Sequence, residues 1–288
     1  MPPCETRNDR ITATDNPVKM VECSIRAFGS VNLSNDELTA IRKVPEPHLG
    51  LPMAASFARH CDEQTLAALS AVAEAIRQLG TQQTDFESWG IVASSRYLGR
   101  SFLAQTLDNF DREGPWNAPT QGAANRSLHS PSGTVSLLLG CCGPNVGVGG
   151  GADGEGQALL TAMSMLYDGS LPGVWLLFSG WSPELNVDGT GQPTTDARCQ
   201  ALAVALEPAS QQSRGLRLRV VPDFEVRDSW STTRTLSWLS LLTTVLHLPP
   251  QNFNLIAPIC DGLRAELVWA SLAAVASSES RPTLRAAG

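Results

Sequence analysis

Short apolar runs and helix-forming segments alternate along most of this chain, and that order limits the folds open to it. The clearest helix is expected at 62–79, where apolar residues recur at helical spacing on one face until Gly80 ends the pattern. Ser34, three residues before Glu37, indicates a capping box and a helix start. Further helices are expected at 102–110 and 153–167. Strands are expected at 21–31, 89–94, 146–148, 174–178, 201–206 and 216–221, the last alternating as strands at a sheet edge do. The alternation predicts an α/β fold, with helices on both faces of a mixed, buried central sheet.

The chain divides by composition into three parts. Residues 1–20 are polar and contain prolines, and we expect a flexible arm there. Residues 21–221 hold the alternating pattern and form the main domain, and 222–288 form an extension that packs on it. In the extension a helix is expected at about 232–247, whereas the apolar runs at 253–259 and 263–272 fit helix or strand. The run at 134–139, in the main domain, is ambiguous in the same way. The most apolar stretch, 236–248, has 13 residues and is too short to cross a bilayer, for which about 20 are needed.

Composition excludes several classes of function. The hydrophobic content of 42% supports a packed core, and a net charge of −7 without a basic run argues against nucleic-acid binding. The seven cysteines lack the paired spacing of a zinc site, and no cofactor or metal is expected. Their odd number, with no leader sequence recognised at the start, predicts reduced cysteines in a cytoplasmic protein.

The segment GPNVGVGGGADGEGQALLTAM (143–163) reads as a strand, a glycine-rich turn and a helix. Residues 149–154 match the GxGxxG pattern of dinucleotide turns, but the match lies in the middle of the chain and arises easily among so many glycines. Asp153 and Glu155 would also occupy the positive end of the helix, where a pyrophosphate binds. We therefore favour a structural turn in which Asp153 caps the helix and glycines permit close backbone packing.

Few side chains are placed for nucleophilic chemistry. His60 adjoins Cys61 in what reads as the start of a surface helix, and Cys142 follows Cys141 before a Gly-Pro turn. A disulfide between adjacent cysteines is strained, so both are expected to be small buried residues. His247 ends an apolar helix, where a cation is favoured.

Residues 85–220 resemble the N-terminal half of the β-ketoacyl synthases, which have the thiolase fold. The resemblance rests on the order and spacing of WGIVASS (89–95), GPNV (143–146), GEGQALLTAMSMLYDG (154–169), VWLLFSGWSPE (174–184), ALAVALEP (201–208) and SRGLRLRVV (213–221). The subgroup called β-ketoacyl synthase-like, N-terminal, is the more similar one; it is associated with aryl polyene and related type II polyketide or fatty-acid pathways. SLHSPSGTVS (127–136) is similar to its Ser-x-His-Asn segment, which places His129 on the family's histidine, with Ser130 in place of asparagine.

This resemblance implies a protein that does not catalyse condensation. The condensing cysteine would fall at Ala152, between Gly151 and Asp153, and an alanine cannot accept an acyl group. Acidic residues beside that position would also raise the pKa of a cysteine placed there. The family's catalytic histidines lie in the second half of its fold, and no histidine follows His247.

The resemblance also implies a partner. Ketosynthases dimerise by pairing the strand before the nucleophile helix, which here contains Val146 and Val148. The loop at 116–130, with Trp116 and His129, would then reach the partner's acyl tunnel. The expected function is that of a chain-length factor in a heterodimer with an active β-ketoacyl synthase, with acyl carrier protein as a further possible partner.

Two other functions stay open. An acyl-carrier-protein hydrolase or acyltransferase would use Cys142, or Cys61 with His60. A stand-alone domain would use its apolar residues after 222 to cover the face that the missing half of the fold normally covers.

Overall fold

One mixed sheet runs through the molecule. The computed structural model describes residues 21–45, 53, 55–80, 85–117, 122, 124–151, 153–186, 188, 196–210, 215–222, 237–249, 254–260 and 262–270. Its eight strands follow the order β3-β2-β4-β5-β1-β6-β8-β7. Their bounds are β1 (Val21–Leu33), β2 (Gly90–Ser95), β3 (Asn145–Gly147), β4 (Val174–Ser182), β5 (Arg198–Pro208), β6 (Gly215–Pro222), β7 (Asn254–Cys260) and β8 (Leu263–Ala270). Strand β2 is parallel to β3 and β4, and the other pairs are antiparallel, so the predicted mixed α/β architecture is confirmed.

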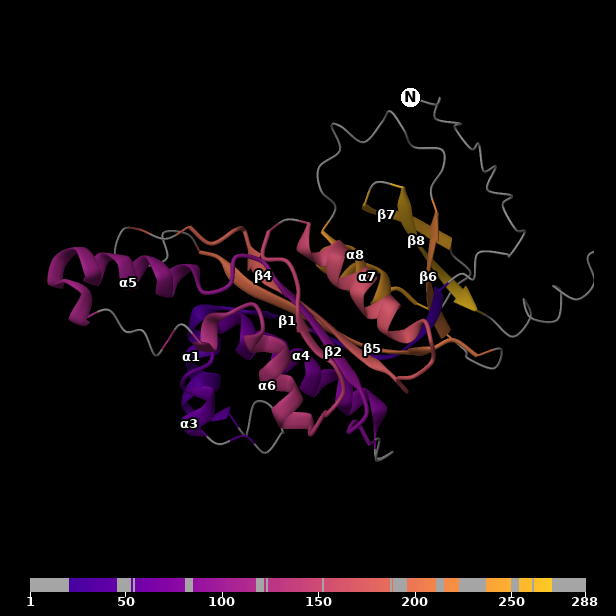
Figure 1. The fold of residues 1–288 in the computed structure, drawn as a ribbon, viewed down its shortest axis with the longest axis horizontal. Helices are drawn as coiled ribbons and strands as arrows, with labels where there is room; N and C mark the ends of the chain where they lie inside the picture. The colour runs from indigo at the N-terminus through magenta and orange to yellow at the C-terminus, as the bar shows by residue number, and fades with distance from the viewer. Residues whose placement is uncertain are drawn as a thin grey trace, which may run out of the picture.

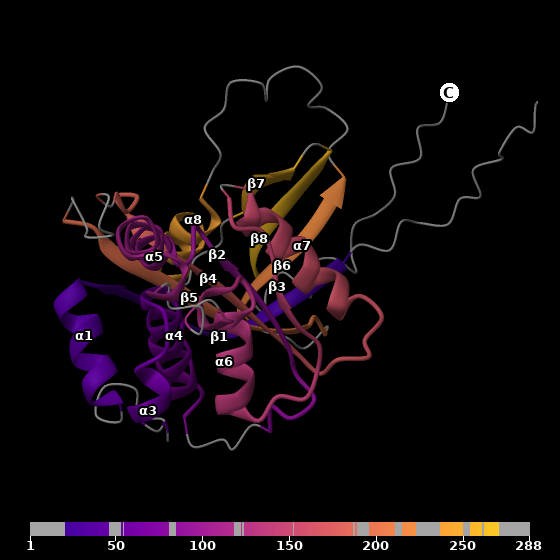
Figure 2. The ribbon, with the colours of Figure 1, turned by 60° about the vertical axis from the view of Figure 1, so that its left-hand side comes forward.

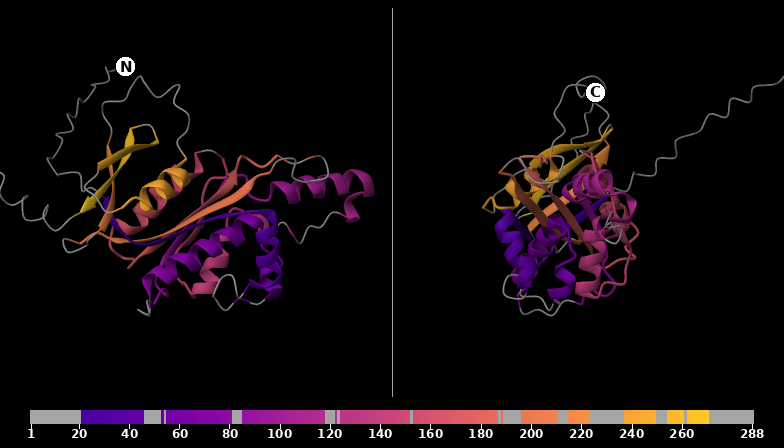
Figure 3. Two further views of the ribbon diagram at one scale, coloured as in Figure 1. Left: turned by 180° about the vertical axis from the view of Figure 1, so that it is seen from behind. Right: turned by 90° about the vertical axis from the view of Figure 1, so that its left-hand side faces the viewer.

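Helices cover both faces of the sheet (Figures 1 and 3). The helices of the described ranges are α1 (Asn35–Lys43), α3 (Ala55–Ala58), α4 (Glu63–Leu79), α5 (Arg100–Glu113), α6 (Ser130–Leu139), α7 (Gly154–Leu166) and α8 (Trp238–Leu246), with short 3₁₀ turns η1 (Pro115–Asn117) and η3 (Ala124–Arg126). Helices α1, α3, α4 and α6 lie on one side, which we call the α4 face. Helices α7 and α8 lie on the other, the α7 face (Figure 1). None of the helices in the described ranges is both long and apolar enough to cross a membrane.

Helix α4 is the centre of the α4 face and forms as its sequence pattern predicts. Asp62 caps it by accepting a hydrogen bond from the Gln64 N–H at 2.9 Å, and Gly80 ends it with a φ of 69°. The helix lies very close to β1, because a Cβ on Gly29 would come within 2.1 Å of the Ala71 carbonyl oxygen. The capping box predicted for α1 is also present between Ser34 and Glu37.

The runs that fitted either helix or strand are now assigned. Residues 134–139 belong to helix α6, and the described parts of the runs at 253–259 and 263–272 lie in β7 and β8. Helix α8 begins at Trp238, and the earlier part of the helix expected at 232–247 lies outside the described residues, as do residues 1–20.

The expectation that 216–221 lies at a sheet edge is wrong. Strand β6 lies between β1 and β8, and the two edges of the sheet are β3 and β7. The sheet therefore continues into strands β7 and β8, which follow residue 222. Figures 1 and 2 show this end of the sheet, with β6, β8 and β7, beside helix α7. The alternation has another cause: Leu216 and Leu218 are buried on the α7 face, while Arg217 and Arg219 pair with acids of neighbouring strands. The charged side of β6 is thus paired across the sheet with acids of β1 and β8.

Candidate functional site

The glycine-rich turn joins edge strand β3 to helix α7. A Cβ on Gly147 would lie 2.2 Å from the Leu128 carbonyl oxygen, and one on Gly149, whose φ is 78°, would lie 2.3 Å from the Gly154 Cα. These glycines therefore permit close backbone packing, as predicted. The capping role expected of Asp153 is wrong: its backbone is helical instead of extended, and its carboxylate makes no capping hydrogen bond.

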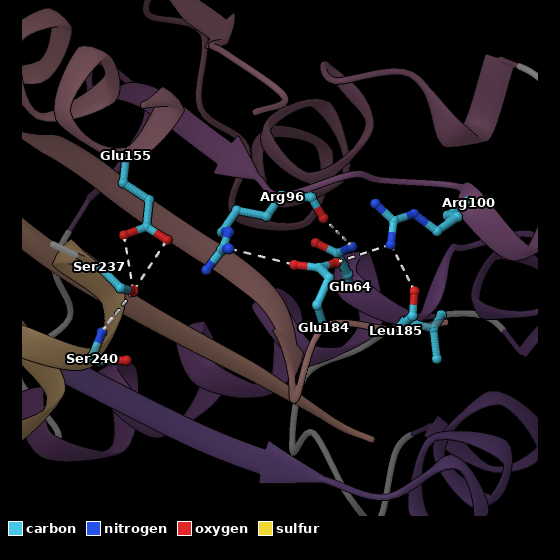
Figure 4. Close-up of polar contacts among 8 residues, drawn as sticks. All are labelled: Gln64, Arg96, Arg100, Glu155, Glu184, Leu185, Ser237 and Ser240. Carbon is cyan, nitrogen blue, oxygen red and sulfur yellow. Dashed lines mark hydrogen bonds and ion pairs between the residues drawn. The ribbon is translucent and has the colours of Figure 1, made fainter. Parts of the chain in front are cut away.

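Glu155, in the first turn of α7, caps a different helix (Figure 4). Its side chain is buried, and its Oε2 atom accepts hydrogen bonds from the Leu239 N–H at 3.0 Å and the Ser237 hydroxyl at 3.2 Å. Ser237 is the N-cap of α8, so the carboxylate lies at the positive end of that helix. Burial raises the pKa of Glu155, while these hydrogen bonds and the nearby charge of Arg96 act in the opposite direction.

A polar cluster continues from Glu155 across the carboxyl ends of β2 and β4 (Figure 4). Glu184 forms ion pairs with Arg96 at 3.4 Å and with Arg100 at 3.5 Å. Arg96 is fixed through its backbone as well, because its carbonyl accepts from the Gln64 amide at 2.8 Å. Sequence reasoning missed this cluster, although a polar Gln64 inside an apolar helix face was a signal of it.

The first turn of α7 is covered by the C-terminal part of the chain. A Cβ on Gly156 would lie 2.7 Å from the Ile259 carbonyl oxygen of β7, and Glu155 is held beneath α8. Ala152, the position implied for the nucleophile, lies outside the described residues; its neighbours Gly151 and Asp153 are exposed. In a ketosynthase, this helix end would have to admit an acyl thioester.

His129 lies at the N-terminus of α6 and lines a groove of about 470 Å³. The groove brings together residues that are far apart in the sequence: His60 and Cys61, His129, and Asn145 of β3. Cys61 is buried, its thiol donates to the Phe57 carbonyl at 3.6 Å, and burial raises its pKa to about 11. It is therefore a weak nucleophile in this state.

The remaining candidate side chains are dispersed. Cys141 is buried but Cys142 is exposed, so the expectation that both are buried is wrong for Cys142, which lies two residues after the C-cap Gly140 of α6. Trp116, in η1, is 94% exposed. His247 ends α8 as predicted and packs edge-on against Phe28. Within the described ranges, no three His, Cys, Asp or Glu side chains gather as metal ligands would.

The edge of β3 presents backbone groups for pairing. Hydrogen bonds from the Ile91 N–H to the Pro144 carbonyl and from the Val148 N–H to the Ala93 carbonyl, both 2.8 Å, tie positions 144 and 148 to β2. Because these groups alternate in direction along a strand, those of Asn145 and Gly147 point to the outer edge. The opposite edge strand, β7, carries Pro258 and a register shift, features that oppose pairing.

Comparison with known structures identifies the fold. One chain of the complex between the ketosynthase ApeO and its chain length factor ApeC, from Xenorhabdus doucetiae, superposes with a TM-score of 0.51; the match has 17% identity and spans 85% of this chain and 98% of that one. The ishigamide ketosynthase/chain length factor matches over 71% of this chain and 68% of its own, with 16% identity and a TM-score of 0.48. No family model and no curated protein matches the sequence. The chain thus has a thiolase-like fold of the ketosynthase type, as the sequence resemblance implied.

Proposed function

We propose that this chain is a non-catalytic chain-length-factor subunit that pairs with an active β-ketoacyl synthase in cytoplasmic polyketide, fatty-acid or aryl polyene synthesis. The observation that carries the proposal is the first turn of α7. Where a ketosynthase needs a reactive cysteine open to substrate, this chain has Ala152 in the sequence and a buried Glu155 that caps α8. Acyl transfer needs an activated nucleophile, and neither residue supplies one.

The neighbouring edge strand β3 supports the proposal of a ketosynthase partner. Its outward backbone groups lie beside the glycine turn, and a second strand added there would satisfy them. On this proposal Val146 lies within the paired strand and Val148 just beyond its end, since β3 ends at Gly147. Residues at 116–130, including Trp116 and His129, would shape the wall of the partner's acyl tunnel.

The match to the ApeO–ApeC complex also supports the proposal. The alignment takes in 98% of the matched chain, which indicates that a chain of similar extent takes part in a ketosynthase–chain length factor assembly. Acyl carrier protein would meet such an assembly at the ketosynthase and is the second partner that we propose.

The test is co-purification. The tagged chain is expressed with a ketosynthase and an acyl carrier protein of the same organism, and the mass of the eluted species is measured. We expect a one-to-one complex with the ketosynthase, and loss of polyketide or fatty-acyl product when this chain is omitted. Elution of the chain alone at every concentration tried would contradict the proposal.

A second candidate, acyl-thioester hydrolysis or transfer, is favoured by one observation: the groove that brings His60, Cys61 and His129 together. Against it, the Cys61 thiol is buried and its raised pKa of about 11 opposes thiolate formation. Incubation with an acyl thioester followed by intact-mass analysis decides, with Cys61→Ala and Cys142→Ala as controls. This candidate function requires that the wild-type chain forms an acyl adduct or hydrolyses the thioester, and that one of the two substitutions abolishes the reaction.

A further inference from the structure

Helix α5 exposes an apolar stripe to solvent. None of its residues is buried, and the exposed fractions are 54% for Leu103, 65% for Leu107 and 47% for Phe110. Their spacing of four and three residues places them on one face. Trp116, just beyond the helix, is 94% exposed. Figure 1 shows α5 standing out from the end of the sheet, away from the helices that cover its faces. An apolar helical stripe normally faces a core, so this one indicates a partner surface.

The base of this helix is fixed to the glycine turn. The Tyr97 N–H donates to the Gly150 carbonyl at 3.0 Å, and the Leu128 side chain lies 3.3 Å from where a Cβ on Gly150 would stand. After α5, in the 3₁₀ turn η3, the Arg126 guanidinium stacks on the Phe102 ring of α5 at 4.1 Å. The N-terminal end of α5 therefore packs against the glycine turn that follows β3.

The size of β3 requires a second surface next to it. A strand of three residues spans only about 10 Å. A stable interface buries roughly 800 Å² on each partner, which so short a strand cannot supply. Helix α5, with 14 residues, is about 21 Å long. An aromatic side chain as exposed as Trp116 adds on the order of 150–250 Å².

The charges of α5 restrict the class of partner that its apolar stripe can bind. Beside the stripe lie Asp108, Asp111 and Glu113, against Arg100 and Arg112. Asp108 and Arg112 form an ion pair at 2.7 Å, which leaves the end of the helix acidic. Helices that lie on anionic membranes carry a basic polar face, and an acidic carrier protein would be repelled. The stripe therefore suits an apolar groove on a folded protein.

We propose that Leu103, Leu107 and Phe110 dock in an apolar groove of the same ketosynthase subunit that pairs with β3, next to the tunnel wall to which Trp116 is assigned. This inference rests on the proposed function and names the second half of its interface. The two contacts together anchor the subunit: the strand fixes its register, and the helix stripe supplies most of the buried apolar area.

The test compares Leu103→Asp/Leu107→Asp with Gln105→Asp, a substitution on the opposite side of the same exposed helix. The affinity of each variant for the purified ketosynthase is measured at one salt concentration, with circular dichroism to show that the helix content is kept. We expect the double variant to bind at least about tenfold more weakly than wild type, and the control to bind unchanged. Hydrogen exchange gives a second readout: amides of α5 should exchange more slowly in the wild-type complex than in the free chain.

The outcomes separate the two proposals. If the wild-type chain binds the ketosynthase and the double variant binds equally well, with α5 exchanging at the same rate in the complex, the docking inference falls and the proposed function stands. If the wild-type chain binds no ketosynthase, both fall. Binding of wild type to phosphatidylserine vesicles or to itself through the stripe, in place of the ketosynthase, also overturns the inference.

Discussion

At the scale of single residues, Asp62 couples folding to pH. Its side chain caps α4, is 3% exposed, and has a pKa raised to about 7, first by burial and then by the charge of Glu63. In the unfolded chain the pKa is about 3.9. The folded state therefore holds a proton that the unfolded state releases between about pH 4 and 7, and stability falls as pH rises through that window.

We expect Asp62→Asn to remove this fall. Asparagine keeps the cap but carries no charge, so the variant should be more stable than wild type at pH 8, by roughly 1–3 kcal/mol, and similar to it near pH 4. Urea unfolding at both pH values measures the difference. Asp85→Asn, at an exposed carboxylate that also accepts a backbone N–H, is the matched control. If the unfolding free energies of Asp62→Asn and wild type changed with pH in the same way, burial would not raise the pKa of Asp62.

Glu155 tests the link between α7 and α8. Glu155→Ala leaves the Leu239 N–H and the Ser237 hydroxyl without their buried acceptor, and the expected loss is about 1–3 kcal/mol of unfolding free energy. Glu155→Gln keeps an acceptor and avoids burying a charge, so its cost should be much smaller. Denaturant unfolding of the three proteins at pH 8 checks the order. Equal losses for alanine and glutamine would mean that charge, and not hydrogen bonding, holds α8.

The local caps were predictable from the sequence and the long-range contacts were not. Ser34 and Glu37 lie three residues apart, so a short pattern reveals their contact. The partners of Glu155 lie more than 80 residues away, and its sequence neighbours suggested a role at its own helix end instead. The role expected of Asp153 failed for a related reason: capping depends on a backbone angle that the glycines around it set, and sequence does not give that angle.

At the scale of elements, the β3 edge is the part of the proposed interface that depends on backbone hydrogen bonds. Asn145→Pro removes the outward N–H without touching the bonds to β2, so the free chain should keep its stability within about 0.5–1 kcal/mol while ketosynthase binding drops at least tenfold. Asn145→Ala keeps that N–H and should bind like wild type. Co-purification yields and unfolding curves of both variants check this. Loss of binding in the alanine variant would assign the effect to the side chain.

Element types followed from the pattern wherever the apolar residues were regular, as in α4 and β4. The runs that became β7 and β8 stayed ambiguous because short apolar segments fit both helix and strand, and pairing with β6 decides them. The place of β6 was misjudged for a physical reason: an interior strand whose charged side chains pair with acids of the neighbouring strands alternates as an edge strand does.

At the scale of the whole molecule, the sheet has two cores, and the C-terminal residues complete only one. The α4 face is closed by α1, α4 and α6, all from the first half of the chain. The α7 face contains Val92, Leu176 and Leu202 of the sheet, but its buried cluster also takes Trp238, Leu239 and Leu242 from α8 and Leu267 from β8. Helix α8 and strand β8 are thus part of the core of the main sheet.

Truncation after Pro222 should therefore expose the α7 face. Burying a large apolar side chain contributes about 1.5–3 kcal/mol, and removal of α8 and β8 takes several of them from one cluster, which exceeds the stability of an ordinary domain. We expect the shortened chain to aggregate, or to bind the dye ANS without a cooperative unfolding transition. Truncation after Ala270 leaves this cluster intact and should unfold like the full chain. A monomeric 1–222 fragment with a cooperative transition would show that the α7 face folds without α8. Helix α8, which Glu155 caps, would then be dispensable for folding.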